Sequence, residues 1–117
     1  MLQQRPQNAV DEYNERLEEL LTGCIENAKK VRASRGKVYD STILFEDYLL
    51  NGPQDVLYEI HKKNLRILNM LRTGEWNPAD DEPIWDSIYD IINYATLLYA
   101  VLKMKQSAIP VEEASVE

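Results

Sequence analysis

The chain has 117 residues, enough for one domain, and it is 44% hydrophobic with only 4 glycines. This composition favours a helical globular protein over a turn-rich β fold. The formal net charge of −7 argues against non-specific nucleic-acid binding, which requires a basic surface. Because the sequence shows no secretory signal, no apolar run of membrane-spanning length and one cysteine, Cys24, we expect a cytoplasmic protein.

The first expected helix covers residues 8–32 and follows a flexible start, residues 1–7. Its apolar residues recur at alternating steps of three and four, which predicts an amphipathic helix. Cys24 lies on this apolar stripe, so we interpret it as a packing residue and not as a nucleophile. The stripe consists of Val10, Tyr13, Leu17, Leu20, Cys24, Ala28 and Val31.

Two helices are expected in the middle of the chain. A short one is expected over residues 42–50, and the turn residues at 51–53 (Asn-Gly-Pro) separate it from a longer helix over 53–72. Gly74 is expected to end the longer helix. Its apolar stripe consists of Val56, Leu57, Ile60, Ile67, Leu68 and Leu71, with Asn64 inside it.

The last helix is expected over residues 83–105, after an acidic loop in which Trp76 is expected to be exposed. Residues 107–117 are expected to form a disordered acidic tail. With no strand pattern in the sequence, we predict a single all-α domain over residues 8–106. Its architecture is expected to be an antiparallel helical bundle of three long helices plus one short helix.

The last helix carries an unusual polar face. Asp86 and Asp90 are one helical turn apart and Asn93 follows three residues later, so all three share a side of the helix. Because apolar residues continue this side, we expect the carboxylates to point into a cleft or a subunit interface. The apolar residues that continue it are Leu97, Val101 and Met104, and the opposite face, which we expect to be core, holds Ile88, Ile91, Ile92, Ala95, Tyr99 and Leu102.

Three short motifs resemble those of the nucleotide modification associated domain 1 family of phage and bacterial proteins. They are Lys63-Asn64-Leu65-Arg66-Ile67, Asp90-Ile91-Ile92-Asn93-Tyr94-Ala95, and the loop Lys37-Val38-Tyr39-Asp40-Ser41. In the loop, the aromatic and the acid stand in swapped order and the family's glycine is missing. The resemblance covers a little over half of the chain and implies a nucleotide-handling protein. It implies that Lys63, Arg66, Asn93, Tyr94 and Asp40 bind the substrate.

The chain is more distantly similar to the all-α nucleoside triphosphate pyrophosphohydrolases of the MazG and dUTPase type. Those enzymes hold Mg²⁺ between acids of two helices, because carboxylates one turn apart can share this hard cation. The similarity implies magnesium ligands at Asp86 and Asp90, and a (deoxy)nucleoside triphosphate as substrate. Lys63 and Arg66 would then neutralise the phosphates. Candidate acids on the first helix are Glu15, Glu18 and Glu19.

The same residues also have a purely structural interpretation. Asp90 is then a buried acid that pairs with Lys63 or Arg66, because ion-pair networks bury carboxylates as often as active sites do. Lys63 and Arg66 could equally pair with Glu59 on the surface. The sequence leaves these interpretations open.

The alternative function is a small helical interaction protein without catalysis. In such a protein, the amides of Asn64 and Asn93 would fix the register of two helices. The apolar last helix would then form a subunit interface. Both hypotheses expect a homo-oligomer that does not enter a membrane, and they differ in whether a nucleotide is the partner.

Overall fold

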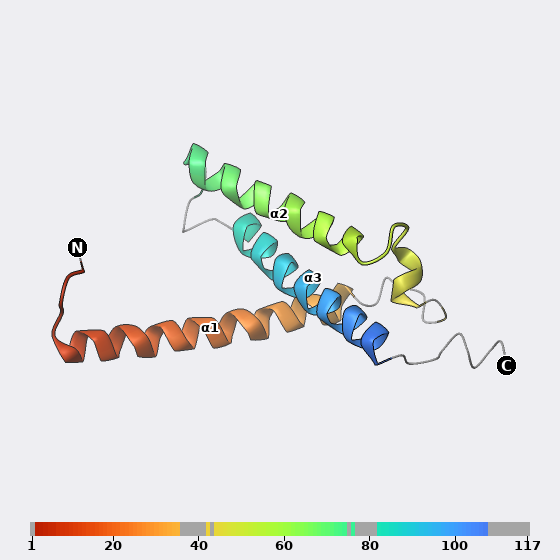
Figure 1. Ribbon diagram of the computed structural model, residues 1–117. Coiled ribbons are helices and arrows are strands. Elements are labelled where there is room, and N and C mark those ends of the chain that lie inside the picture. Colours follow the sequence, from red (N-terminus) through yellow and green to blue (C-terminus); the bar gives the residue numbers. More distant parts are fainter. Residues whose placement is uncertain (1, 36–41, 43, 75, 77–81, 108–117) are drawn as a thin grey trace.

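The structure is a computed structural model that describes residues 2–35, 42, 44–74, 76 and 82–107. These residues contain helices and no strand, so the prediction of an all-α fold with three long helices and one short one is confirmed. The short helix is a single 3₁₀ turn and covers fewer residues than the predicted range of 42–50. In chain order, the elements are α1 (Gln7–Arg35), η2 (Phe45–Tyr48), α2 (Gln54–Thr73) and α3 (Glu82–Gln106), as Figure 1 shows.

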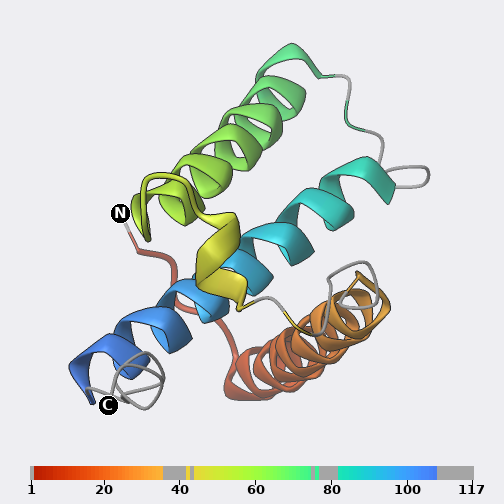
Figure 2. The ribbon, with the colours of Figure 1, turned by 90° about the vertical axis from the view of Figure 1, so that its right-hand side faces the viewer.

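Helix α3 lies between the other two long helices. Helix α2 runs antiparallel to α3 and packs along it, while α1 crosses α3 on the opposite side (Figures 1 and 2). The described contacts between α1 and α3 involve the C-terminal half of α1. Helix α3 is therefore the element on which side chains from both neighbours converge.

The turn that opens α2 and the glycine that ends it agree with the sequence prediction. Gly52 has a φ of 82° and Pro53 is the N-cap of α2. The backbone N–H of Asn51 donates to the Asp55 carboxylate at 2.9 Å and thereby ties the turn to the first helical turn. Gly74 ends the helix in the left-handed conformation, with φ 70°, which a residue without Cβ adopts at little cost.

The buried centre of the described residues is small and partly polar. Its apolar members are Ala28, Val56, Ile84 and Val101, so each long helix contributes. Ser87, Asp90 and Asn93 of α3 are buried beside them. The face of α3 that carries Asp90 is therefore the face that packs against the other helices.

The opposite face of α3, which the sequence predicted to be core, is largely exposed. Tyr99 is 65% exposed, Leu102 is 49% exposed, and Ala95 also faces solvent. Ile88, Ile91 and Ile92 are only half-buried. This prediction is wrong because hydrophobicity alone was used to orient the helix, whereas ion pairs and hydrogen bonds from α1 and α2 draw the polar face inward.

Two further side chains differ from their predicted environment. Asn64 is exposed, whereas Val56 on the same helix is buried. Helix α2 therefore packs through the side that carries Val56, and Asn64 lies outside that contact. Trp76 is half-buried, and its ring packs edge-on against Trp85 with centroids 6.2 Å apart and planes at 85°. An edge-to-face pair of this kind stabilises by about 1 kcal/mol beyond its burial.

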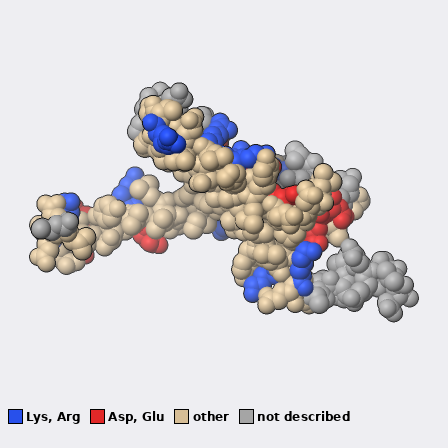
Figure 3. All heavy atoms as spheres, turned by 45° about the horizontal axis from the view of Figure 1, so that its top comes forward, with Lys and Arg blue, Asp and Glu red and all other residues tan. Residues whose placement is uncertain are grey.

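The molecule is extended because the first half of α1 projects from the rest. Its radius of gyration is 19.2 Å and its longest extent is 66 Å, whereas a compact chain of this length would have a radius of gyration of roughly 13 Å. Figure 3 shows this half of α1 as an arm on the left of the molecule. Within the described part of the chain, none of the helices combines the length and apolarity that a membrane span requires.

Candidate functional site

The Asp90 carboxylate is the point where the three long helices meet. Asp90 is 5% exposed. Its Oδ2 lies 3.1 Å from Nζ of Lys63 on α2, and its Oδ1 accepts a hydrogen bond from Nη1 of Arg35 on α1. We call Arg35, Lys63 and Asp90 the Asp90 cluster. The predicted pairing of Asp90 with Lys63 is confirmed, and charge-assisted hydrogen bonds of this kind are among the stronger polar contacts in proteins.

Sequence reasoning missed Arg35. The first helix was expected to end at residue 32, whereas α1 continues to Arg35 and brings this guanidinium to Asp90 of α3. The available signal was the run of basic residues at the end of the helix, since a basic last turn is favourable to the helix dipole and extends the helical pattern. Recognising the partner of Arg35 required the crossing of α1 and α3.

Asn93 and Tyr89 also tie α3 to α1. The Asn93 amide donates to the backbone carbonyl of Ala28 at 3.0 Å, and both groups are buried. The Asn27 amide donates to the Tyr89 hydroxyl at 3.2 Å. Asn93 therefore has a structural role in fixing two helices, as one interpretation expected. Its partner is a backbone carbonyl and not the predicted Asn64, which is exposed.

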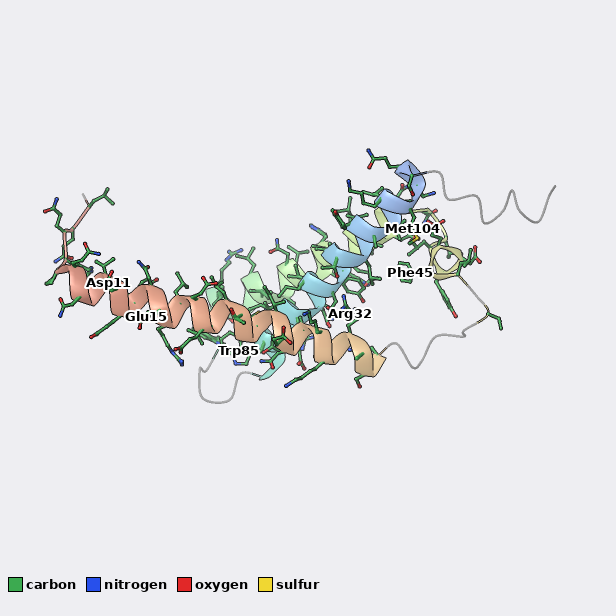
Figure 4. The ribbon with its side chains drawn as sticks, turned by 90° about the horizontal axis from the view of Figure 1, so that it is seen from below. Asp11, Glu15, Arg32, Phe45, Trp85 and Met104 are labelled. Atoms are coloured by element: carbon green, nitrogen blue, oxygen red, sulfur yellow. The ribbon has the colours of Figure 1, made fainter. Side chains whose placement is uncertain are left out.

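An open hollow of about 410 Å³ is lined by residues of η2, α2 and α3, and along both long helices it lies one turn from the Asp90 cluster. Tyr94 lines it from α3, one helical turn after Asp90, and Glu59 lines it from α2, one turn before Lys63. Figure 4 shows Phe45 on η2, beside the C-terminal half of α3. Four aromatic residues, Phe45, Tyr48, Tyr58 and Tyr94, line this aromatic hollow together with the acids Asp55 and Glu59.

The side of α2 that borders the aromatic hollow changes from acidic to basic along its length. Asp55 and Glu59 line the hollow, and Lys62 and Arg66 follow at helical spacing on the same side. Lys62 donates to Glu59 at 2.9 Å, and this hydrogen bond raises the pKa of the Lys62 ammonium. Figure 3 shows basic side chains along α2. Arg66 is exposed on this basic stretch, one turn beyond Lys63.

The charge balance of the Asp90 cluster is positive. One carboxylate faces two cations, and the Lys63 and Arg35 side chains keep 25% and 52% of their surface exposed. Both bases therefore retain donor groups that solvent or an anion can reach. Arg66 lies one turn beyond Lys63 and adds a third cation. The part of the site around Lys63 therefore favours a negatively charged group.

Asp86 and Asp90, the predicted magnesium ligands, have different environments in the structure. Both oxygens of Asp90 are engaged by Lys63 and Arg35, and Asp86 is exposed one turn nearer the start of α3. The part of the chain that the structure describes holds no group of three or more His, Cys, Asp or Glu side chains that could bind a metal ion. Asp86 lies on the same side of α3 as Asp90, as predicted, but only Asp90 is buried.

The other residues singled out from the sequence can now be placed or set aside. Glu15, Glu18 and Glu19 are exposed on the projecting half of α1, so in one copy of the chain they do not line the aromatic hollow. Asp40 lies outside the described residues. Cys24, interpreted as a packing residue, is half-buried on α1.

No protein-family model, no curated protein and no solved structure matches the chain. The resemblance to the nucleotide modification associated domain 1 family therefore stays a prediction that rests on the motifs quoted above. What the structure adds is that Lys63 of one motif and Asp90 of the other are in direct contact.

Proposed function

We propose that this protein binds a nucleotide between α2 and α3. The observation that carries the proposal is the adjacency of two unlike surfaces: an aromatic hollow and, one helical turn away, a cluster with surplus positive charge. A nucleotide joins the same two chemistries, a planar apolar base and an anionic phosphate chain. A pocket of a few hundred Å³ with a few convergent polar groups is typical of small-molecule sites.

The base is proposed to enter the aromatic hollow. Tyr94 and Tyr58 reach it from α3 and α2, and Phe45 and Tyr48 reach it from η2. Stacking of a base on such rings contributes roughly 1–3 kcal/mol per base and tolerates different bases. Asp55 and Glu59 at the rim are acceptors for the amino and imino hydrogens of a base.

The phosphates are proposed to extend along α2 toward Lys63 and Arg66. Arg35 and Lys63 already neutralise Asp90, and their remaining donors, with the exposed guanidinium of Arg66, suit phosphate oxygens. Asp90 is then a positioning residue that holds two cations at the site. Asn93 is proposed to act through the same framework, by keeping α1 on α3.

Magnesium is proposed to arrive with the nucleotide, because Mg²⁺ in nucleotide sites is commonly held by substrate phosphates plus one or two carboxylates. Asp86 is the exposed carboxylate nearest to Asp90 along α3 and is the candidate for this contact. The MazG-like similarity implies hydrolysis to a monophosphate and pyrophosphate.

Isothermal titration of the protein with deoxynucleoside mono-, di- and triphosphates, with and without Mg²⁺, tests this proposal. We expect binding that strengthens with the number of phosphates. Tyr94→Leu should weaken it roughly tenfold, the effect of losing one stacking ring. Arg66→Gln should weaken triphosphate binding more than monophosphate binding, because a phosphate contact is lost.

The matched controls lie on the same helices. Tyr99→Leu removes an exposed tyrosine of α3 that does not line the hollow, and Arg72→Gln removes an exposed arginine at the far end of α2. Neither should change nucleotide affinity. Absence of binding to the whole panel, or equal losses in variants and controls, would contradict the proposal. Release of pyrophosphate in the presence of Mg²⁺ would extend it from binding to catalysis.

A further inference from the structure

The projecting half of α1 leaves a row of apolar side chains uncovered. Tyr13, Leu17, Leu21 and Ile25 stand four residues apart, which places them in one ridge along the helix. Each is between 41% and 67% exposed. The hydrogen bonds described between α3 and α1 lie further along, at Asn27, Ala28 and Arg35. Burying this ridge would remove large apolar groups from water, so the chain has an unfilled packing surface.

The charges of α1 are segregated along its length. Residues 7–21 contain five acids and one base, whereas residues 22–35 contain four bases and one acid. Figure 4 shows Asp11 and Glu15 on the free part of α1 and Arg32 at the end that crosses α3. A second α1 laid parallel would therefore set acid against acid, and an antiparallel one would set acid against base.

We propose that two copies of this chain associate through an antiparallel pair of α1 helices, with Leu21 next to the two-fold axis. Helical spacing places Asp11, Glu15, Lys29 and Arg32 on one side of the Leu21 ridge. In an antiparallel pair, Asp11 of one copy lies opposite Arg32 of the other, and Glu15 lies opposite Lys29. A two-fold interface repeats each of these contacts.

The charged side chains required by this pairing are accessible. Asp11, Glu15 and Arg32 are exposed. Among the described residues, Lys29 pairs with Glu26 of the preceding turn, at 3.3 Å and with both side chains more than half exposed. Such a surface pair contributes little free energy, so Lys29 is available to a second copy. The α3 helix of each copy contacts α1 through Asn27 and neighbouring residues, away from this charged side.

Charge reversal tests both the partner and the direction of pairing. One variant carries Asp11→Lys and Glu15→Lys, and the other carries Lys29→Glu and Arg32→Glu. Each alone should self-associate at least tenfold more weakly than the parent chain, because like charges then face each other. Mixed in equal amounts, the two variants should form a heterodimer as stable as the parent dimer, as measured by analytical ultracentrifugation.

Cysteine cross-linking provides a second, independent measurement in a Cys24→Ser background. Leu21→Cys should form an intermolecular disulfide on oxidation, because only residues beside the two-fold axis meet their own copies at disulfide distance. Tyr13→Cys should not, since in an antiparallel pair it faces the other end of the partner helix. Circular dichroism verifies that each variant remains helical.

Four results would contradict the proposal. The first is a parent chain that sediments as a monomer at every concentration. The second is a cross-link through Tyr13→Cys, which would mean a parallel pair. The third is self-association that is unaffected by Leu21→Glu, a change in the middle of the ridge. Failure to restore the heterodimer by mixing the two charge-reversed variants would exclude the proposed pairing even if a dimer exists.

Discussion

The two halves of α1 share one amphipathic pattern, but the second half packs against α3 and the first half projects from the molecule. In the second half, Asn27, Ala28 and Arg35 each bond to a residue of α3. In the first half, Tyr13 and Leu17 remain exposed on the same helix. The difference lies in the polar groups. An apolar stripe alone did not determine where α1 packs, whereas the amide and guanidinium contacts coincide with the site of packing.

This comparison separates hydrophobic patterning from specificity. Apolar burial is non-directional and roughly proportional to area, so a long stripe can pack at several registers. A buried carboxylate between two cations tolerates only one register, since an unpaired buried charge is costly. The Asp90 cluster is therefore expected to specify the crossing of α1 and α3, and changes to it should have the largest effects on stability.

Replacing Asp90 by Ala should produce the largest effect. The change leaves Lys63 and Arg35 facing each other without their shared carboxylate, and we expect a loss of about 3 kcal/mol in the free energy of unfolding. Urea unfolding followed by circular dichroism measures it. A loss below about 0.5 kcal/mol, the range of ordinary surface changes, would show that the cluster does not hold the helices together.

Replacing Asn93 by Ala should have the second largest effect. It removes the hydrogen bond to the Ala28 carbonyl, which is buried, and we expect a loss of about 1–2 kcal/mol. The same change should increase hydrogen exchange in the second half of α1 more than in α2, because only α1 is released. Thr96, whose hydroxyl bonds within its own helix, offers the control Thr96→Ala; equal exchange in both variants would contradict this role of Asn93.

The two cations of the cluster should differ in their contributions. Lys63 is the more buried of the two, at 25% against 52% exposure for the Arg35 side chain. Lys63→Met is therefore expected to cost about 1 kcal/mol and Arg35→Met less, since solvent screens the more exposed pair. Thermal unfolding of both variants in one buffer checks the order. The reverse order would place the main attachment of Asp90 on α1.

The smallest effect is expected in the first half of α1. Tyr13→Gln should change the unfolding free energy by less than about 0.5 kcal/mol at protein concentrations where the chain is monomeric, because this side chain is largely exposed. At higher concentrations the loss should grow if two copies share this surface. A large loss that is independent of concentration would mean that the arm packs on its own chain.

Much of the fold was accessible from the sequence because it depends on local rules. Each long helix begins within one residue of its predicted start, since periodic apolar positions, the Asn51-Gly52-Pro53 break and the Gly74 stop act over a few residues. Two features of the fold did not follow from these local rules. The short helix covers fewer residues than predicted, Phe45–Tyr48 instead of 42–50. The polar face of α3, and not its predicted apolar core face, packs against the other helices.

The candidate site also has a part that the sequence predicted and a part that it did not. Lys63, Asp90, Asn93 and Tyr94 were singled out from motifs, and the contact of Asp90 with Lys63 was among the expected pairings. The aromatic hollow was not predicted, because its walls come from η2, α2 and α3 together. Residues far apart in sequence line one pocket only after the helices have been placed.

The sequence by itself determined the three long helices, where each begins, and the presence of an acid within an apolar helix. Only the tertiary structure decided which acid is buried: Asp90 lies under the crossing of α1, whereas Asp86, one turn earlier, stays exposed. The physical reason is that helix formation follows from hydrogen bonds within a few residues. Burial of a charge depends on whether distant cations, here Arg35 and Lys63, reach it.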